Sequence, residues 1–185
     1  MLNLEQMNQI IGAALVTLET KLAPGKEFSI ANPEVIKTSG AYGSVILCAL
    51  FTGGVEGRLT WTMDWGTGFA IAEILSGKKV DGFNEVTQQA LEGLFHEFLQ
   101  SVANSLSESG LQLDIRVLPT LVDTSVLLSE DGNPGAIKVP INIENGSIIL
   151  FLSLEAGTAQ PVLSEIPVEM APTGEPGSDS GAQAA

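Results

Sequence analysis

The sequence contains little from which a disulfide or a Cys/His metal site could be built. Among its 185 residues there is one cysteine, Cys48, and one histidine, His96. A single cysteine excludes a disulfide within the chain. One cysteine and one histidine are also too few ligands for a zinc site made of the usual Cys and His side chains. A chain of this length can bury an adequate hydrophobic core without such cross-links. We therefore expect no metal site and no cofactor in this chain.

Basic residues are also scarce, with 8 Lys and Arg against 22 Asp and Glu, which gives a formal net charge of -14. Nucleic acids and anionic membranes attract proteins through positive patches, so we expect neither as a partner. No run of residues approaches the ~20 apolar residues of a membrane span. The segment Met1–Gln9 has no Lys or Arg, unlike the start of an export signal. We therefore expect a cytoplasmic protein.

Composition divides the chain near residue 156. Residues 157–185 hold four of the nine prolines, and their only charged residues are acidic. Such a segment buries too little apolar surface to offset the entropy of ordering it. We predict one domain over residues 1–156 and a largely disordered acidic tail over residues 157–185. The apolar residues of segment 161–170 leave a docking role open.

Residues 1–156 alternate between helical and strand periodicity. Two segments, IANPEVI (30–36) and RVLPTLV (116–122), each place a proline at the entry of a strand that follows a helix. This order of elements, repeated twice, predicts a pseudo-symmetric α+β domain whose antiparallel-rich sheet carries two long helices on one face. The helices are expected over 4–21, 67–76 and 84–109, and the strands over 28–30, 34–37, 44–52, 57–63, 112–117, 120–128, 136–143 and 147–154.

The long helix predicted over 84–109 divides cleanly on a helical wheel of about 100° per residue. One side is apolar and is expected to face the core: Leu91, Leu94, Phe95, Phe98, Leu99, Val102 and Leu106. The opposite side is polar: Gln89, Gly93, His96, Glu97, Gln100 and Asn104. A glycine inside a helix costs about 1 kcal/mol relative to alanine. Two readings stay open, a solvated face with a tolerated glycine or a docking face that a partner approaches at Gly93.

The stretch FTGGVEGRLTWTMDWGTGFAIAEILSG (51–77), followed by VTQQALEGLFHEFLQSVANSLSESGLQLDIRVLPTLV (86–122), resembles the CheC/CheX/FliY family of bacterial chemotaxis proteins. The resemblance covers about residues 1–155, and a single compact copy of this length resembles the CheX branch more than CheC or FliY. It implies a CheX-like fold, a homodimer, and a phosphorylated CheY-like receiver as partner in chemotaxis or two-component signalling. Any Mg²⁺ would belong to the receiver domain.

The family is known for dephosphorylating CheY, with the signature Asp/Ser-x3-Glu-x2-Asn-x22-Pro on its long helix. The Asn amide positions the attacking water and the Glu pairs with a lysine of the receiver, so catalysis is a matter of positioning. When Pro119 anchors the signature, its three chemical positions fall on Gln89, Gly93 and His96. Gly93 has no carboxylate where the signature has Glu, and His96 has no amide where the signature has Asn.

Three hypotheses follow from this loss. In the first, the domain is catalytically inactive and serves as a dimerising or scaffold module that docks through the exposed face of the long helix. In the second, neighbouring groups substitute: His96 or Gln100 orients water, and Glu92 or Glu97 reaches the receiver, with Asn104 on the same face. In the third, the first helix carries the site through Glu5-x2-Asn8, although 24 residues separate Asn8 from Pro33 and Met1 stands at the Asp/Ser position.

Overall fold

The computed structural model of the chain describes residues 4–22, 28–36, 40–54, 56–108, 110–127 and 136–155. The predicted tail and its boundary near residue 156 lie outside them. The described residues form three helices and eight strands, in the predicted order. No helix in these ranges combines the length and the apolar character needed to cross a bilayer. The elements are α1 (Leu4–Leu22), β1 (Phe28–Ile30), β2 (Glu34–Ile36), β3 (Gly40–Gly53), β4 (Glu56–Met63), α2 (Trp65–Ser76), α3 (Glu85–Glu108), β5 (Leu113–Val117), β6 (Leu121–Leu127), β7 (Ala136–Ile143) and β8 (Gly146–Glu155).

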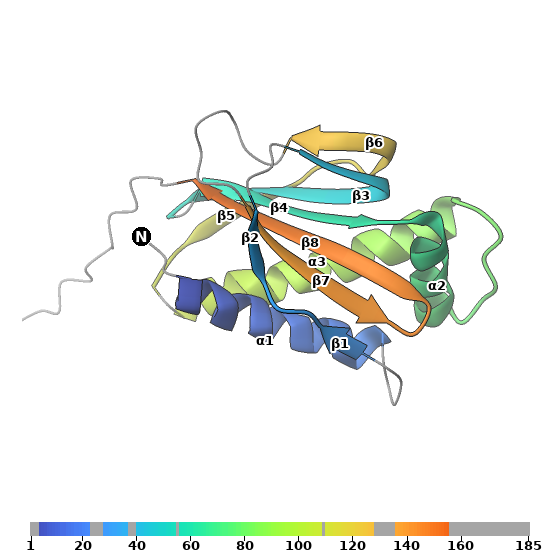
Figure 1. The fold of residues 1–185 in the computed structure, drawn as a ribbon, viewed down its shortest axis with the longest axis horizontal. Coiled ribbons are helices and arrows are strands. Elements are labelled where there is room, and N and C mark those ends of the chain that lie inside the picture. Colours follow the sequence, from blue (N-terminus) through green and yellow to red (C-terminus); the bar gives the residue numbers. More distant parts are fainter. Residues whose placement is uncertain are drawn as a thin grey trace, which may run out of the picture.

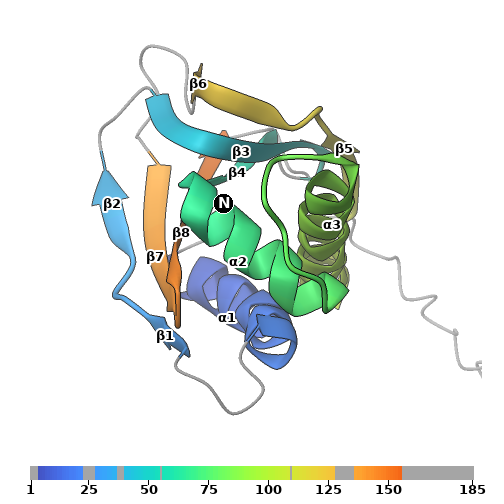
Figure 2. The ribbon, with the colours of Figure 1, turned by 90° about the vertical axis from the view of Figure 1, so that its right-hand side faces the viewer.

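All strands pair antiparallel in one sheet, with β8 and β4 at its centre, flanked by β7 and β3 (Figure 1). At one edge β1 and β2 both pair with β7, and at the other β5 and β6 both pair with β3. The sheet is bent, and the three helices lie in the angle between its two wings (Figure 2). The predicted α+β fold, with both long helices on one face, is confirmed.

The predicted pseudo-symmetry is visible in the strand order. The half α1-β1-β2-β3-β4 has the same order of elements as the half α3-β5-β6-β7-β8. Each half donates its first two strands to the third strand of the other half. Pro33 separates β1 from β2 and Pro119 separates β5 from β6, so the two prolines occupy equivalent breaks. Because proline lacks an N–H for the ladder, each break interrupts an edge strand rather than a central one.

The core lies between the helices and the concave face of the sheet. Trp61 of β4 is fully buried, and its ring meets Phe95 and Phe98 of α3 edge to face, with centroids 4.9 and 5.0 Å apart. Such aromatic pairs add about 0.5–1.5 kcal/mol to the burial of their area. The apolar stripe predicted for the long helix is confirmed, because all seven of its residues are buried: Leu91, Leu94, Phe95, Phe98, Leu99, Val102 and Leu106.

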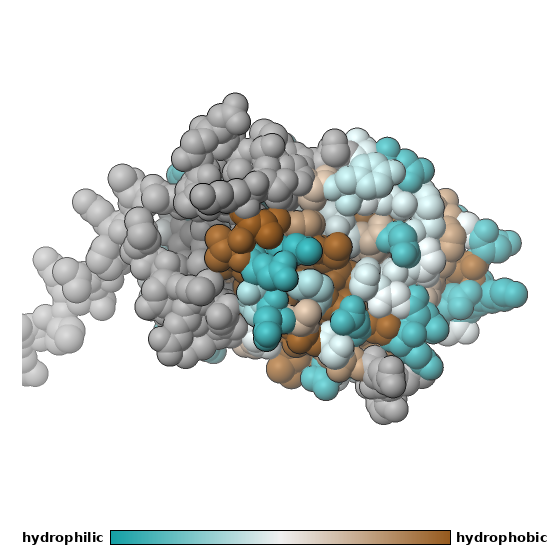
Figure 3. Space-filling view, viewed as in Figure 1, coloured by the Kyte–Doolittle hydropathy of each residue, from teal (hydrophilic) through white to brown (hydrophobic). Residues whose placement is uncertain are grey.

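The outer side of the sheet is mixed in character. On the side that faces the viewer in Figure 1, hydrophobic residues lie next to hydrophilic ones (Figure 3). Ala41 and Phe151 form a small second core, packed by Ile36 and Ile149. Ile30 and Val35 of the edge strands β1 and β2 are also exposed, but they pair with the core residues Ile141 and Ile137 and so lie on the helix side of the sheet. Single exposed hydrophobic residues are common on soluble domains and need no partner.

Two elements differ in extent from the sequence prediction. Helix α2 begins at Trp65 rather than at residue 67, because the carboxylate of Asp64 accepts a hydrogen bond from the Thr67 backbone N–H at 2.7 Å and caps the helix. Strand β3 begins at Gly40 rather than at residue 44, because its first half pairs with β6. At Gly43 this half passes close to β4, and a β-carbon there would lie 2.9 Å from Thr62 Cβ.

Replacement of Gly43 by alanine therefore forces β3 away from β4. We expect Gly43→Ala to lower the free energy of unfolding by about 1–3 kcal/mol, measured by urea denaturation. Gly12→Ala in α1 is the control, since a β-carbon at Gly12 meets nothing within 4 Å. It should raise stability by up to about 1 kcal/mol. Equal effects of the two substitutions would contradict this packing.

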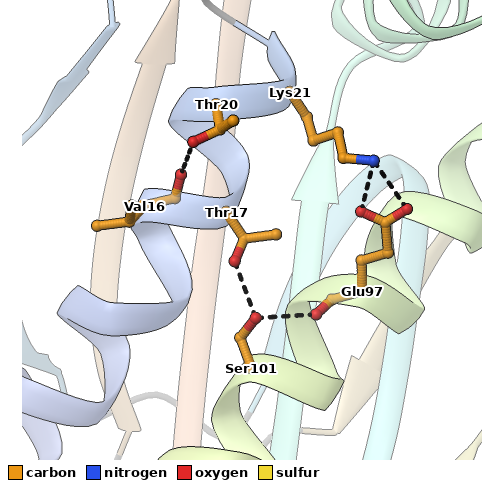
Figure 4. A network of polar contacts seen from close by, with 6 residues as sticks. All are labelled: Val16, Thr17, Thr20, Lys21, Glu97 and Ser101. Carbon is orange, nitrogen blue, oxygen red and sulfur yellow. Dashed lines mark hydrogen bonds and ion pairs between the residues drawn. The ribbon is translucent and has the colours of Figure 1, made fainter.

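A polar network joins the antiparallel helices α1 and α3 (Figure 4). The hydroxyl oxygens of Thr17 and Ser101 lie 2.8 Å apart, and Lys21 Nζ lies 2.9 Å from Glu97 Oε2. The side chains of Lys21 and Glu97 are 45% and 50% exposed. An ion pair this exposed contributes little to stability, but it holds the Glu97 carboxylate towards α1.

A double-mutant cycle with Lys21→Met and Glu97→Gln measures this pair. We expect a coupling of about 0.2–1 kcal/mol at low salt, because both side chains remain in contact with water. The coupling should fall towards zero at about 1 M salt, where screening acts over roughly 3 Å. A coupling that is unchanged by salt would contradict the exposed pair described for α1 and α3.

Candidate functional site

The candidate site is the exposed side of α3. The Asn84 side chain caps this helix by accepting the Thr87 backbone N–H at 3.1 Å, and Gly110 follows its end in a left-handed conformation with φ of 80°. Both limits agree with the predicted helix. The predicted polar face is exposed at every position: Gln89, Gly93, His96, Glu97, Gln100 and Asn104.

Several side chains on this face bond along the helix. Gln89 Nε2 donates to Glu85 Oε1 at 3.0 Å, and Gln100 Nε2 donates to Asn104 Oδ1 at 3.1 Å. His96 Nδ1 lies 2.8 Å from the backbone oxygen of residue 92. A carbonyl oxygen can only accept, so Nδ1 is the donor in this contact. An imidazole therefore stands where the family signature has an amide.

Gly93 has no role in packing that the described residues reveal. A β-carbon at this position would meet nothing within 4 Å, and the backbone does not adopt a positive φ. Neither steric crowding nor backbone conformation therefore requires a glycine in the middle of α3, where it costs about 1 kcal/mol. Its effect is to leave the helix backbone open to close approach from outside.

Glu92 and Glu97, the two glutamates of α3 nearest to Gly93 in the sequence, have different surroundings. Glu92 is partly buried, and its Oε1 accepts hydrogen bonds from Thr120 Oγ1 at 2.6 Å and from Gln88 Nε2 at 2.8 Å. Glu97 is turned to Lys21 of α1. The sequence did not single out Thr120 or Lys21. The one signal for Thr120 was its place directly after Pro119, the anchor of the signature.

The structure brings Glu92, Gly93 and His96 together, but it does not restore the signature at these positions. Gly93 offers no carboxylate. Glu97 and Gln100, two of the neighbouring groups that could substitute for the signature residues, have partners within the chain, Lys21 and Asn104 respectively. The first-helix candidates, Glu5 and Asn8, both lie within α1, and their side chains are outside what the structure describes.

Cys48 is a core residue rather than a nucleophile. It is 1% exposed on β3. Burial raises the pKa of its thiol, and a hydrogen bond from Thr60 and the charge of Arg58 only partly offset this rise. A thiol with a raised pKa is protonated at neutral pH and is inaccessible here, so it cannot attack a substrate. The described residues also contain no group of three or more His, Cys, Asp or Glu side chains that could hold a metal ion.

Comparison with protein-family models and with curated protein sequences finds no match for this chain. Solved structures do match. The chemotaxis protein CheX from Desulfovibrio desulfuricans is 18% identical, with a TM-score of 0.71 over 82% of this chain and 100% of that one. CheX in a complex with CheY, BeF3 and Mg²⁺ from Borrelia burgdorferi is 18% identical, with a TM-score of 0.64 over 83% and 99%. FliY from Thermotoga maritima is 19% identical, with a TM-score of 0.52 over 82% and 91%.

These matches cover the two pseudo-symmetric halves together and span nearly the whole length of the CheX chains. At such low identity they establish the architecture and not the chemistry. The sequence resemblance predicted this architecture, and the prediction is confirmed. The chain has the α+β fold of the CheC/CheX/FliY proteins.

Proposed function

We propose that this chain binds a phosphorylated CheY-like receiver domain through the exposed face of α3, in chemotaxis or two-component signalling. The observation that carries the proposal is the shared fold with a CheX protein whose structure includes CheY, BeF3 and Mg²⁺. BeF3 with Mg²⁺ mimics a phosphoryl group on the receiver. The Mg²⁺ belongs to the receiver, and this chain supplies the docking surface.

The chemistry of α3 supports this choice of surface. The helix contains four glutamates and neither lysine nor arginine, so it complements a basic partner surface and repels an acidic one. Its face at Gly93 is open, which lets a partner reach the helix backbone. The apolar stripe anchors the helix in the core, so the exposed face is held in a fixed orientation.

A side chain placed at Gly93 should block this approach without harming the fold. We expect Gly93→Gln to weaken binding of the BeF3-activated receiver by at least about tenfold, measured by isothermal titration calorimetry. The variant should unfold at an equal or higher urea concentration than the wild type. It replaces a glycine that is unfavourable inside a helix, and a β-carbon at this position meets nothing within 4 Å.

The matched control is Gly12→Gln, the same change at a glycine of α1 where a β-carbon also meets nothing within 4 Å. It should leave the affinity for the receiver unchanged. Loss of binding in Gly12→Gln but not in Gly93→Gln would show that the receiver docks on α1 and not on α3.

Dephosphorylation of the receiver is the second candidate function. The observation that favours it is Glu5-x2-Asn8, which keeps the signature spacing within α1. In this reaction a water oxygen forms a bond to phosphorus while the bond to the aspartyl oxygen breaks, which releases inorganic phosphate. The Asn8 amide would hold the water in line with the leaving oxygen.

We expect Asn8→Ala to abolish any acceleration of phospho-receiver decay by the wild-type chain, while folding and binding persist. Decay is measured with radiolabelled receiver at saturating concentrations of the chain. If activity is lost in His96→Ala or Gln100→Ala instead, the water-positioning group lies on α3. If the wild-type chain binds without accelerating decay, binding alone is its function, and the domain acts as a scaffold on this fold.

A further inference from the structure

The two arginines of the chain lie on the outer side of the sheet, which faces away from the helices. Arg58 of β4 and Arg116 of β5 each pair with Leu50 of β3. The neighbours of Leu50 along β3, Ala49 and Phe51, belong to the core, so Leu50 and its two partners point to the opposite side. The spacing of strands places the two arginines about 10 Å apart, with Leu50 between them.

This arginine pair has no counter-charge among the residues that the structure describes. Glu56 and Asp114 lie two residues away on the same strands and the same side, yet neither forms an ion pair with an arginine. The Nε of Arg58 is buried and has no hydrogen-bond partner in the described part of the chain. A buried donor without an acceptor is costly, so the surroundings of Arg58 call for an acceptor from elsewhere.

We propose that segment 161–170 of this chain, PVLSEIPVEM, docks on the arginine pair and covers Leu50. The segment follows β8 along the chain and lies outside the described residues. The proposal concerns the side of the sheet opposite to α1 and α3, so it does not rest on receiver binding.

The composition of the segment matches this surface. Its only charged residues are Glu165 and Glu169, and a carboxylate forms strong, charge-assisted hydrogen bonds with a guanidinium group. Leu50 is half-buried, so apolar side chains that cover it complete its removal from water. The segment supplies five such side chains: Val162, Leu163, Ile166, Val168 and Met170.

The place of the segment in the chain brings it to this site. Strand β8 ends at Glu155, which pairs with Glu56 of β4, two residues before Arg58 (Figure 1). Glu165 follows Glu155 by ten residues, which can span up to about 33 Å. The path from β8 across β4 and β3 to β5 is three strand spacings, about 14 Å. A short tether also gives the segment an effective concentration of about millimolar, so even a weak contact is populated.

The other source of carboxylates is the link between β6 and β7, residues 128–135, which contains Glu130 and Asp131. It has one aliphatic side chain, Leu128, against the five apolar side chains of segment 161–170. The segment therefore matches both the charge of the arginines and the apolar surface of Leu50, whereas the link matches the charge alone.

The test is a paramagnetic NMR measurement on the full-length chain. Cys48 is buried, so a cysteine introduced by Ser164→Cys can be labelled selectively with a nitroxide. We expect the label to broaden the backbone amide signals of residues 49–52, 57–59 and 114–117. The signals of α2 should keep their intensity, because α2 begins seven residues beyond Arg58, at the other end of β4.

Variants of the labelled chain assign the contact. Glu165→Gln combined with Glu169→Gln should remove most of this broadening, and so should about 1 M salt, since it screens charges beyond roughly 3 Å. Arg116→Gln should have the same effect, and because Arg116 is exposed this change leaves the core intact.

Each variant has a matched control. Glu175→Gln combined with Asp179→Asn removes the same charge from residues beyond the segment, and it should leave the broadening unchanged. Lys138→Gln removes a positive charge from the outer side of β7, where Lys138 already pairs with Glu34 at 3.8 Å, and it too should leave the broadening unchanged.

Three outcomes would overturn the proposal. The first is a wild-type segment whose label leaves the signals around Arg58 and Arg116 intact. The second is equal loss of broadening in the control variants, since overall charge would then be the cause. The third is broadening that appears only between a labelled copy and a separate isotope-labelled copy, which would make the contact intermolecular. If Glu130→Gln with Asp131→Asn shifts the arginine amides while the label has no effect, the link between β6 and β7 occupies the site instead.

Discussion

The apolar stripe of α3 packs against Trp61, and this contact sets the orientation of the helix on the sheet. Trp61 is fully buried on β4, one of the two central strands, and its ring meets Phe95 and Phe98 edge to face. This contact fixes the rotation of α3 about its axis, since a turn of one residue, about 100°, would bring polar side chains into the core. The set of residues that α3 presents to a partner, including Gly93 and His96, is therefore decided by packing inside the molecule.

The pseudo-twofold arrangement explains why the fold offers two candidate sites. Helices α1 and α3 are equivalent, antiparallel and joined through Thr17, Ser101, Lys21 and Glu97. Each half exchanges its two edge strands with the other, so neither half has a complete sheet by itself. The two helices have nevertheless diverged in sequence. The first keeps the Glu-x2-Asn spacing, whereas the second has Gly93 and His96 in its place.

Much of this fold could be predicted from the sequence because helical and strand periodicities are strong here. The buried stripe of α3, the order of the helices and strands, and the proline at the strand entry in each half were all predicted. The contacts of Glu92 with Thr120 and of Glu97 with Lys21 could not be predicted from the sequence. They join residues 28 and 76 positions apart, which only tertiary packing brings together. Gly146, at the start of β8, is a further example. It lacks a positive φ, and it instead lies so close to Thr67 that a β-carbon would collide with that side chain.

Receiver binding through α3 is tested most directly by an NMR titration of the isotope-labelled chain with unlabelled BeF3-activated receiver. We expect backbone amide chemical shifts to change along residues 89–100 and in the neighbouring link 118–122, while those of α1 and of strands β1 and β2 do not change. Changes confined to α1, or to the edge formed by β1 and β2, would contradict binding through α3 even if the receiver binds tightly.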